Sequence, residues 1–159
     1  MVSHIYFDWS GTLAKPVRRG TLKRGHCKAL YSDVKPMLAY LCHAGYTLGM
    51  ITNSDKDVSF LIGCLRKYGL LPYFKGAIVT ASMRGMREKP APTIFRRALE
   101  LDGIEASDAL MVGNDFYKDI IGAGKVGMRT AFIDRTGAGP QGAEDIYVKN
   151  ILGLGMYLK

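Results

Sequence analysis

Four groups of polar side chains follow short apolar runs in this sequence, and their types together suit phosphoryl transfer. The groups are Asp8, Thr52, Lys89, and Gly113-Asn114-Asp115 with Asp119. A carboxylate can act as a nucleophile and form a covalent intermediate. A lysine and a Mg²⁺ ion with oxygen ligands can spread the charge that develops on a transferring phosphoryl group. A strand-end Asp or Thr alone is more often a turn or helix-cap residue, so the prediction depends on the combination.

Short apolar runs alternate along the chain with segments of helical periodicity, which is typical of βαβ units. The expected strands cover residues 4–7, 46–52, 77–80, 109–112 and 129–133. The expected helices cover residues 33–44, 58–69 and 119–126, with one starting at Pro92 and a closing one at 148–158. This alternation predicts an α/β fold with a mainly parallel, five-stranded sheet. Because the carboxyl ends of parallel strands open on one crevice, the four polar groups should converge there.

Length, apolar content and cysteine spacing set limits on the class of protein. The 159 residues suffice for one hydrophobic core, so we expect residues 1–159 to form a single domain. No apolar stretch reaches membrane-spanning length, and residues 1–7 lack a leader pattern; we therefore expect no membrane partner and a cytoplasmic location. Cys27, Cys42 and Cys64 lack metal-ligand spacing and are odd in number, which favours reduced thiols.

Positive charge is concentrated in two parts of the chain. The formal net charge of +8 favours an anionic partner, such as a phosphorylated compound, a nucleic acid or an acidic protein face. Residues 14–32 fit no helix or strand and hold six Lys or Arg residues with no acid between Asp8 and Asp33. We interpret them as a basic flap that either contacts substrate or is simply solvated. Arg84 and Arg87 form a second basic cluster, which favours a substrate with several phosphates.

Four segments resemble the motifs of the haloacid dehalogenase superfamily, whose members are mostly phosphatases. The segments are Asp8-Trp9-Ser10-Gly11-Thr12-Leu13, Ile51-Thr52-Asn53, Lys89-Pro90, and Val112 through Ile120. The match covers nearly the whole chain, from Phe7 to about Ile133. This resemblance implies a Rossmann-like three-layer sandwich around the parallel sheet.

The resemblance also implies roles for the candidate site residues. Asp8 would be the nucleophile that forms an aspartyl-phosphate, while Thr52 and Lys89 would bind the transferring phosphate. The ligands of a Mg²⁺ ion would be Asp8, the backbone carbonyl of Ser10, Asn114, Asp115 and Asp119, the last of which could instead orient Lys89. The further phosphate-binding residues would be Gly11, Thr12, Asn53, Arg84 and Arg87.

Ser10 departs from the family pattern, because phosphatases of this family carry a second Asp two residues after the nucleophile. That Asp protonates the leaving group and deprotonates the attacking water, and losing such a group costs about 10²–10⁴-fold in rate. Relatives without it do other chemistry: haloacid dehalogenases place Tyr there, and phosphonoacetaldehyde hydrolases have Asp-Trp-Ala-Gly-Thr. We therefore expect slow turnover of alkyl esters and better turnover of acyl or aryl phosphates.

Asn114 is the second departure, since it replaces a metal-binding Asp and brings no charge. The chain also lacks room for the usual cap insertions after the first motif or between the second and third. The resemblance then implies a capless member with an open cleft, suited to a bulky or macromolecular substrate or to closure by another subunit. A nucleic-acid partner stays open although no nucleic-acid-binding motif is found, and a homo-oligomer stays open as well.

These observations together predict a Mg²⁺-dependent phosphatase that acts slowly through an aspartyl-phosphate. Two alternatives remain. The first is a catalytically weak protein on the same scaffold that binds phosphorylated or acidic partners, which Ser10 and Asn114 both favour. The second is a non-phosphatase hydrolase of the same superfamily. We prefer the phosphatase because Asp8, Thr52 and Lys89 are all present.

Overall fold

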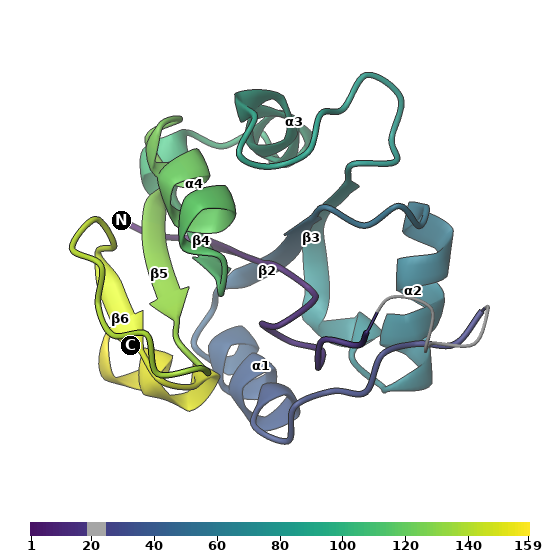
Figure 1. The fold of residues 1–159 in the computed structure, drawn as a ribbon, viewed down its shortest axis with the longest axis horizontal. Helices are drawn as coiled ribbons and strands as arrows, with labels where there is room; N and C mark the ends of the chain where they lie inside the picture. Colours follow the sequence, from purple (N-terminus) through teal and green to yellow (C-terminus); the bar gives the residue numbers. More distant parts are fainter. Residues whose placement is uncertain (19–24) are drawn as a thin grey trace.

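A parallel sheet forms the centre of the protein in this computed structural model, which describes residues 1–18 and 25–159. Within those residues the sheet has six strands in the order β3-β2-β1-β4-β5-β6, and all neighbouring strands run parallel (Figure 1). The strands are β1 (His4–Phe7), β2 (Thr47–Thr52), β3 (Phe74–Thr80), β4 (Ala109–Gly113), β5 (Arg129–Ile133) and β6 (Ile146–Val148). The predicted α/β fold is therefore confirmed.

The first strand, β1, lies in the middle of the sheet and is buried on both faces. Ile5, Tyr6 and Phe7 are fully buried, which explains why this segment is a continuous apolar run rather than an alternating one. β1 pairs with β2 on one side and β4 on the other. The strand order therefore reverses at β1, and ligands of open α/β sheets bind at the carboxyl ends of the strands beside such a point.

Helices cover both faces of the sheet and give the predicted three layers. They are α1 (Val34–His43), α2 (Val58–Lys67), α3 (Pro92–Asp102) and a π-helical segment (Phe116–Ile121) that continues into α4 (Gly122–Gly124). Residues of α1 and α2 pack into one apolar cluster and residues of α3 and α4 into another, and Figure 1 shows α3 and α4 on the side opposite α1. None of the described helices combines the length and apolar character needed to cross a bilayer.

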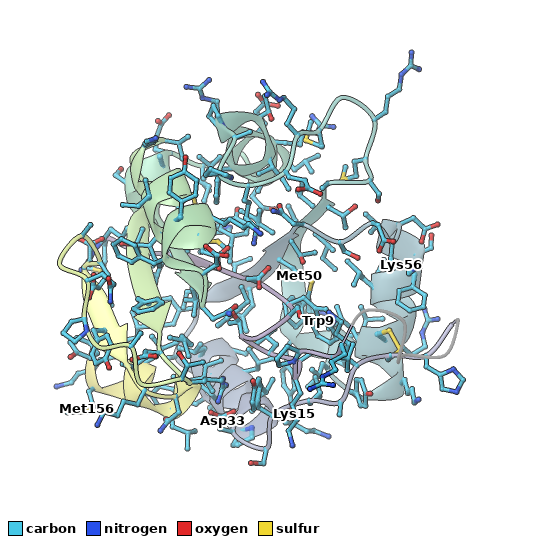
Figure 2. The ribbon with its side chains drawn as sticks, viewed as in Figure 1. Trp9, Lys15, Asp33, Met50, Lys56 and Met156 are labelled. Atoms are coloured by element: carbon cyan, nitrogen blue, oxygen red, sulfur yellow. A yellow bond between two sulfur atoms is a disulfide. The ribbon has the colours of Figure 1, made fainter. Side chains whose placement is uncertain are left out.

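Figure 2 shows how side chains fill these layers. Met50 and Trp9 lie inside the molecule and are 0% and 5% exposed. Met156 lies at the periphery and is 80% exposed. The core thus reaches up to Trp9, directly beside Asp8, so the first motif begins on a rigidly packed strand.

The carboxy-terminal region differs from the prediction. The sheet has six strands rather than five, because residues 146–148 form β6 beside β5. The predicted helix at 148–158 is instead β6 followed by a 3-10 helix at Ile151–Met156. Gly153 and Gly155 weaken an α-helix, and a Cβ at Gly153 would come within 2.8 Å of the Val148 side chain.

The basic segment 14–32 is attached to the body of the protein at several points. Ala14 forms isolated bridges with Ser10 and Leu30, and Cys27 forms a disulfide with Cys64 of α2. The prediction of reduced thiols is therefore wrong for this pair, because their contact depends on the fold and not on their spacing. Only Cys42 is a free thiol among the described residues. Arg19, Lys23 and Arg24 lie outside the described residues.

Candidate active site

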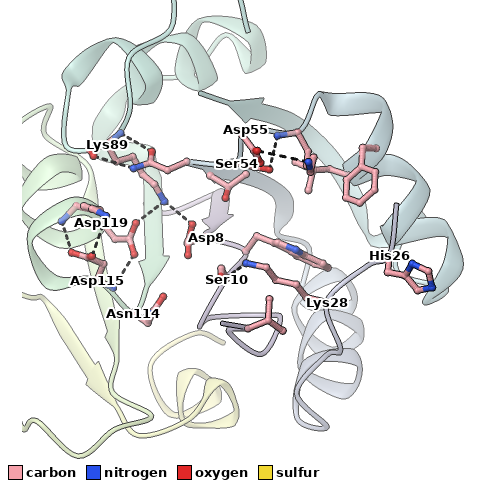
Figure 3. Close-up of a pocket in the computed structure, with 18 of the residues that line it drawn as sticks. Asp8, Ser10, His26, Lys28, Ser54, Asp55, Lys89, Asn114, Asp115 and Asp119 are labelled. Carbon is pink, nitrogen blue, oxygen red and sulfur yellow. Dashed lines mark hydrogen bonds and ion pairs between the residues drawn. The ribbon is translucent and has the colours of Figure 1, made fainter. Parts of the chain in front are cut away.

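A cleft of about 720 Å³ lies at the carboxyl ends of β1, β2 and β4. It brings together most of the candidate residues that the sequence places after different strands. The predicted site residues that line it are Asp8, Ser10, Thr52, Asn53, Lys89, Asn114, Asp115 and Asp119, and Figure 3 labels all of these except Thr52 and Asn53. These eight residues thus converge at one edge of the sheet, as predicted.

Four predicted phosphate-binding residues do not line this cleft. Thr12 is fully buried, and Gly11 lies against the Asn114 side chain, which a Cβ at this position would hit. Arg87 borders a separate shallow pocket with Glu88 and Pro90. Arg84 is exposed and is not among the described residues that line either pocket.

Lys89 connects the two ends of the site. Its Nζ donates to Asp8 Oδ1 at 2.7 Å and to Asp119 Oδ1 at 2.6 Å (Figure 3). It also donates to the Ile51 carbonyl at 2.9 Å. Burial by itself lowers the pKa of the Lys89 ammonium, but the charges of Asp8 and Asp119 outweigh it and leave the pKa raised. Lys89 is therefore a fixed positive charge held against the carboxylate of Asp8.

Asp119 is almost completely buried beside this cluster. Burial and then the negative charge of Asp8 raise the pKa of its carboxyl to about 7, against the opposing pull of Lys89. Its Oδ2 accepts the backbone N–H of Asp115 at 3.0 Å. Gly113 makes room for this arrangement, because a Cβ there would collide with the Asp119 carboxylate.

Asn53 holds the main chain of Lys89 in place. Its Oδ1 accepts the Lys89 backbone N–H at 2.6 Å, and its Nδ2 donates to the Lys89 carbonyl at 3.0 Å. Both ends of the Asn53 amide are thus engaged with Lys89. This pair of contacts fixes the residue from which the Lys89 side chain reaches Asp8.

Oxygen atoms suited to a hard cation gather on the side of the cleft formed by β1 and β4. Asn114 Oδ1 accepts the Thr12 hydroxyl at 3.1 Å, and Asp115 Oδ1 accepts the Lys118 backbone N–H at 2.8 Å as the cap of the π-helical segment. Among the described residues no group of three or more His, Cys, Asp or Glu side chains is placed to hold a metal. The expected Mg²⁺ site also uses a backbone carbonyl and an amide, and such oxygen donors fit that ion.

Lys28 is a cleft residue that no pattern in the sequence singles out. Its Nζ donates to Ser10 Oγ at 2.7 Å (Figure 3). Where family phosphatases have an acid, this chain therefore has a hydroxyl that is hydrogen-bonded to a lysine. In the sequence Lys28 is one of six basic residues in the segment 14–32, and only the folded segment distinguishes it. Other cleft residues of this kind are Lys56, Phe60 and Lys118.

Comparisons with known proteins identify the family. The family model described as haloacid dehalogenase-like hydrolase matches residues 11–133. This chain belongs to that family. The match confirms the family resemblance predicted from the sequence.

Two curated relatives and one solved structure describe its similarity within the family. A glyceraldehyde 3-phosphate phosphatase of Pyrococcus abyssi is 34% identical over 98 residues, which cover 62% of this chain and 40% of that protein. An N-acylneuraminate-9-phosphatase of Rattus norvegicus is 28% identical over 88% of this chain and 50% of that protein. The chain therefore spans half or less of the length of these relatives. A HAD phosphatase from Thermococcus onnurineus shares the fold, with a TM-score of 0.82 at 24% identity over 99% of this chain and 98% of that one.

Proposed function

We propose that this protein is a Mg²⁺-dependent phosphatase that works through an aspartyl-phosphate on Asp8. The observation that carries the proposal is the Asp8 carboxylate at the end of β1, held 2.7 Å from Lys89 Nζ in an accessible cleft. A carboxylate fixed in this way at a strand-reversal point is suited to attack a bound phosphoryl group. Two relatives named as phosphatases support the same chemistry.

The residues of the cleft account for the transfer of the phosphoryl group. Asp8 Oδ2, the oxygen to which Lys89 does not donate, would attack phosphorus while the bond from phosphorus to the leaving oxygen breaks. The positive charge of Lys89 beside Asp8 would stabilise the phosphoryl oxygens as their charge develops, and the Thr52 hydroxyl would hydrogen-bond them. Water would then attack phosphorus and break its bond to Asp8, which releases phosphate and restores the carboxylate.

The proposed cation site consists of Asp8, the Ser10 carbonyl and Asn114, with Asp115 or Asp119 as a further ligand. When bound, Mg²⁺ supplies positive charge that neutralises the phosphoryl oxygens. Both Asp119 oxygens already accept hydrogen bonds, Oδ1 from Lys89 Nζ and Oδ2 from the Asp115 backbone N–H. We therefore assign Asp119 mainly the role of holding Lys89, and Asn53 the same role from the other side.

The proposed substrate is a phosphorylated small molecule, as the names of the two relatives suggest. Those names give no support to the predicted bulky, macromolecular or nucleic-acid substrate, nor to an oligomer. We also propose that residues 1–159 form one domain without a cap between β1 and α1. In keeping with this, the described residues between β1 and α1 form only turns and isolated bridges.

The test is hydrolysis of an aryl phosphate by the purified protein, with Mg²⁺ or with a chelator. We expect Mg²⁺-dependent release of phosphate that disappears in Asp8→Asn, which keeps the shape of the side chain but removes the nucleophile. Equal turnover by wild type and Asp8→Asn, or activity unaffected by the chelator, would contradict the proposal.

A second candidate function is a binding module with little catalytic power, which the Ser10–Lys28 contact favours. A hydroxyl in the position of the family acid cannot exchange protons as a carboxyl group does. This candidate predicts binding of inorganic phosphate or a phosphorylated ligand with no turnover of any phosphate in the same assay. Its ligand affinity should fall in Lys89→Met.

A further inference from the structure

The contact between Lys28 and Ser10 points to a substrate class for the cleft, and this inference rests on the proposed phosphatase function. We propose that Lys28 makes the leaving-group side of the site cationic, so that the protein acts on acyl phosphates. In these substrates the leaving group is a carboxylate, which departs as an anion and needs no proton. Alkyl phosphates, whose alkoxide leaving group needs a proton, should be poor substrates.

Lys28 stands where it can meet a leaving group. Ser10 is two residues after the nucleophile, and both Ser10 and Lys28 line the same cleft as Asp8. In Figure 3 the Asp8 carboxylate lies between Lys89 and the Ser10–Lys28 pair. Lys89 therefore pairs with the nucleophile Asp8, whereas Lys28 lies on another side of the cleft. An ammonium group has three donors, so the bond to Ser10 Oγ leaves donors for a ligand.

The charge of Lys28 is not neutralised by the group it contacts. Lys56 and Lys118 also line the cleft, but their Nζ atoms lie 3.7 and 3.9 Å from carboxylate oxygens of Asp55 and Asp115. Lys28 donates instead to the neutral Ser10 hydroxyl. Its ammonium thus brings a full positive charge into a partly buried part of the cleft, where such a charge stabilises an anion more strongly than in water.

The main chain around Lys28 is fixed to the protein body, so the cation is positioned before a substrate binds. The Tyr68 hydroxyl donates to the Lys28 carbonyl at 2.8 Å, and the preceding Cys27 is joined to Cys64 of α2. On the other side, the Lys15 backbone N–H donates to the Ala29 carbonyl at 2.7 Å. A charge held in this way loses little conformational freedom when it binds a developing anion.

The reaction with an acyl phosphate needs no general acid. Asp8 Oδ2 attacks phosphorus, the bond from phosphorus to the carboxylate oxygen breaks, and its electron pair leaves with that oxygen. Lys28 and the Ser10 hydroxyl hydrogen-bond the departing carboxylate. Water then attacks phosphorus, Asp8 is released as a carboxylate, and the proton of water goes to the phosphate product or to solvent. An ammonium is a far weaker acid than a carboxyl group, so Lys28 acts by charge rather than by proton transfer.

The experiment compares kcat/KM for acetyl phosphate and glycerol 2-phosphate in wild type, Lys28→Met and Lys28→Arg. We expect Lys28→Met to lower the value for acetyl phosphate by about ten- to a hundredfold, as for loss of one charge-assisted hydrogen bond in the transition state. The value for glycerol 2-phosphate should change much less, and Lys28→Arg should retain most of the acetyl phosphate activity. Lys149→Met, which removes an exposed lysine outside the cleft, is the matched control and should equal wild type.

Equal losses on both substrates in Lys28→Met, or no loss on either, would overturn the inference. A second measurement needs no variant: wild-type kcat/KM for aryl phosphates of graded leaving-group pKa. A steep fall with rising leaving-group pKa supports an unprotonated leaving group, whereas a flat dependence overturns the inference even if Lys28→Met does not fold. If aryl phosphate is turned over in an Asp8-dependent manner, the proposed phosphatase function stands even when the inference about Lys28 fails. If no phosphate is turned over, both proposals fail.

Discussion

At the scale of single residues, the three charged side chains at the base of the cleft form one interdependent unit. Lys89 is 3% exposed and is the hydrogen-bonding partner of both Asp8 and Asp119. Two carboxylates this close repel one another, and only the shared ammonium makes their burial tolerable. The stability of the site and its proposed function therefore depend on the same residue.

Replacing Lys89 by Met should destabilise the protein strongly. Removal of one partner of a buried ion pair leaves uncompensated charge, so we expect the free energy of unfolding to fall by about 3–5 kcal/mol. Adding Asp119→Asn to the variant should recover part of this loss, since it removes one of the two repelling charges. Urea denaturation of the single and double variants measures both effects. A Lys89→Met variant as stable as wild type would show that the ion pairs contribute nothing.

Ser10→Asp tests the account of the missing acid. If slow turnover of alkyl phosphates results from the lack of a carboxyl group, the substitution should raise their kcat/KM by at least about tenfold, as part of the 10²–10⁴-fold effect that such groups have in full. Lys28 would pair with the introduced carboxylate and oppose its protonation, so the gain should be larger when Lys28→Met is added. Steady-state assays on glycerol 2-phosphate check this. A folded variant without any gain contradicts the explanation.

At the scale of structural elements, the loop after β5 is organised around one carboxylate. Asp134 accepts backbone N–H groups from Gly137, Ala138 and Gly139, at 2.8 to 3.0 Å, and the Tyr147 hydroxyl at 2.9 Å. The hydrogen bond from the Gly139 N–H makes the largest contribution, and together these donors hold the pKa of Asp134 well below its ordinary value of 3.8. The ionised side chain thus joins β5, the loop and β6.

Because of this loop, the free energy of unfolding should depend on pH in the acid range. Because the folded-state pKa of Asp134 is depressed, its stabilisation is complete above pH 3.8 and is lost as the pH falls towards the folded-state value. Asp134→Asn should therefore be less stable than wild type at neutral pH, and the difference should shrink below about pH 4. Chemical denaturation across this pH range is the measurement, with the exposed Glu105→Gln as control. A difference that stays constant with pH would argue against this role.

The disulfide is the covalent link between the basic segment and α2. It closes a segment with a sequence separation of 37 residues, so replacing both Cys27 and Cys64 by Ser should lower the free energy of unfolding by about 2–4 kcal/mol. Alkylation of the native protein should modify Cys42 alone. Modification of all three thiols without reductant would show that the bond is absent in solution.

At the scale of the whole molecule, sequence patterning predicts the sheet and the cleft but not the contacts that complete them. The apolar run ending at Asp8 and the segments ending at Thr52 and Gly113 mark the central strands, because buried parallel strands are continuous apolar runs. β6 cannot be predicted in this way, because Ile146–Val148 is too short to show periodicity. A second hidden feature is Arg135, which joins Asp33 before α1 to the Thr12 carbonyl of the first motif at 2.9 to 3.0 Å.

The same limit applies to the site. The types and order of Asp8, Thr52 and Lys89 indicate phosphoryl transfer, and the structure brings them to one cleft. The contact of Lys28 with Ser10 joins residues 18 positions apart in a segment without periodicity, and the clamp of Asn53 on Lys89 spans 36 positions. Such pairs follow from how the chain folds back on itself, which no local spacing encodes.

The most direct test of the account is to trap the phosphoryl group on the protein. Wild type is mixed with acetyl phosphate or an aryl phosphate and Mg²⁺, quenched in acid within one turnover, and analysed by peptide mass spectrometry. We expect the added mass of one phosphoryl group on the peptide that contains Asp8, labile to hydroxylamine and absent from Asp8→Asn. Turnover of substrate with no phosphoryl group on Asp8, or with the group on another residue, would contradict it.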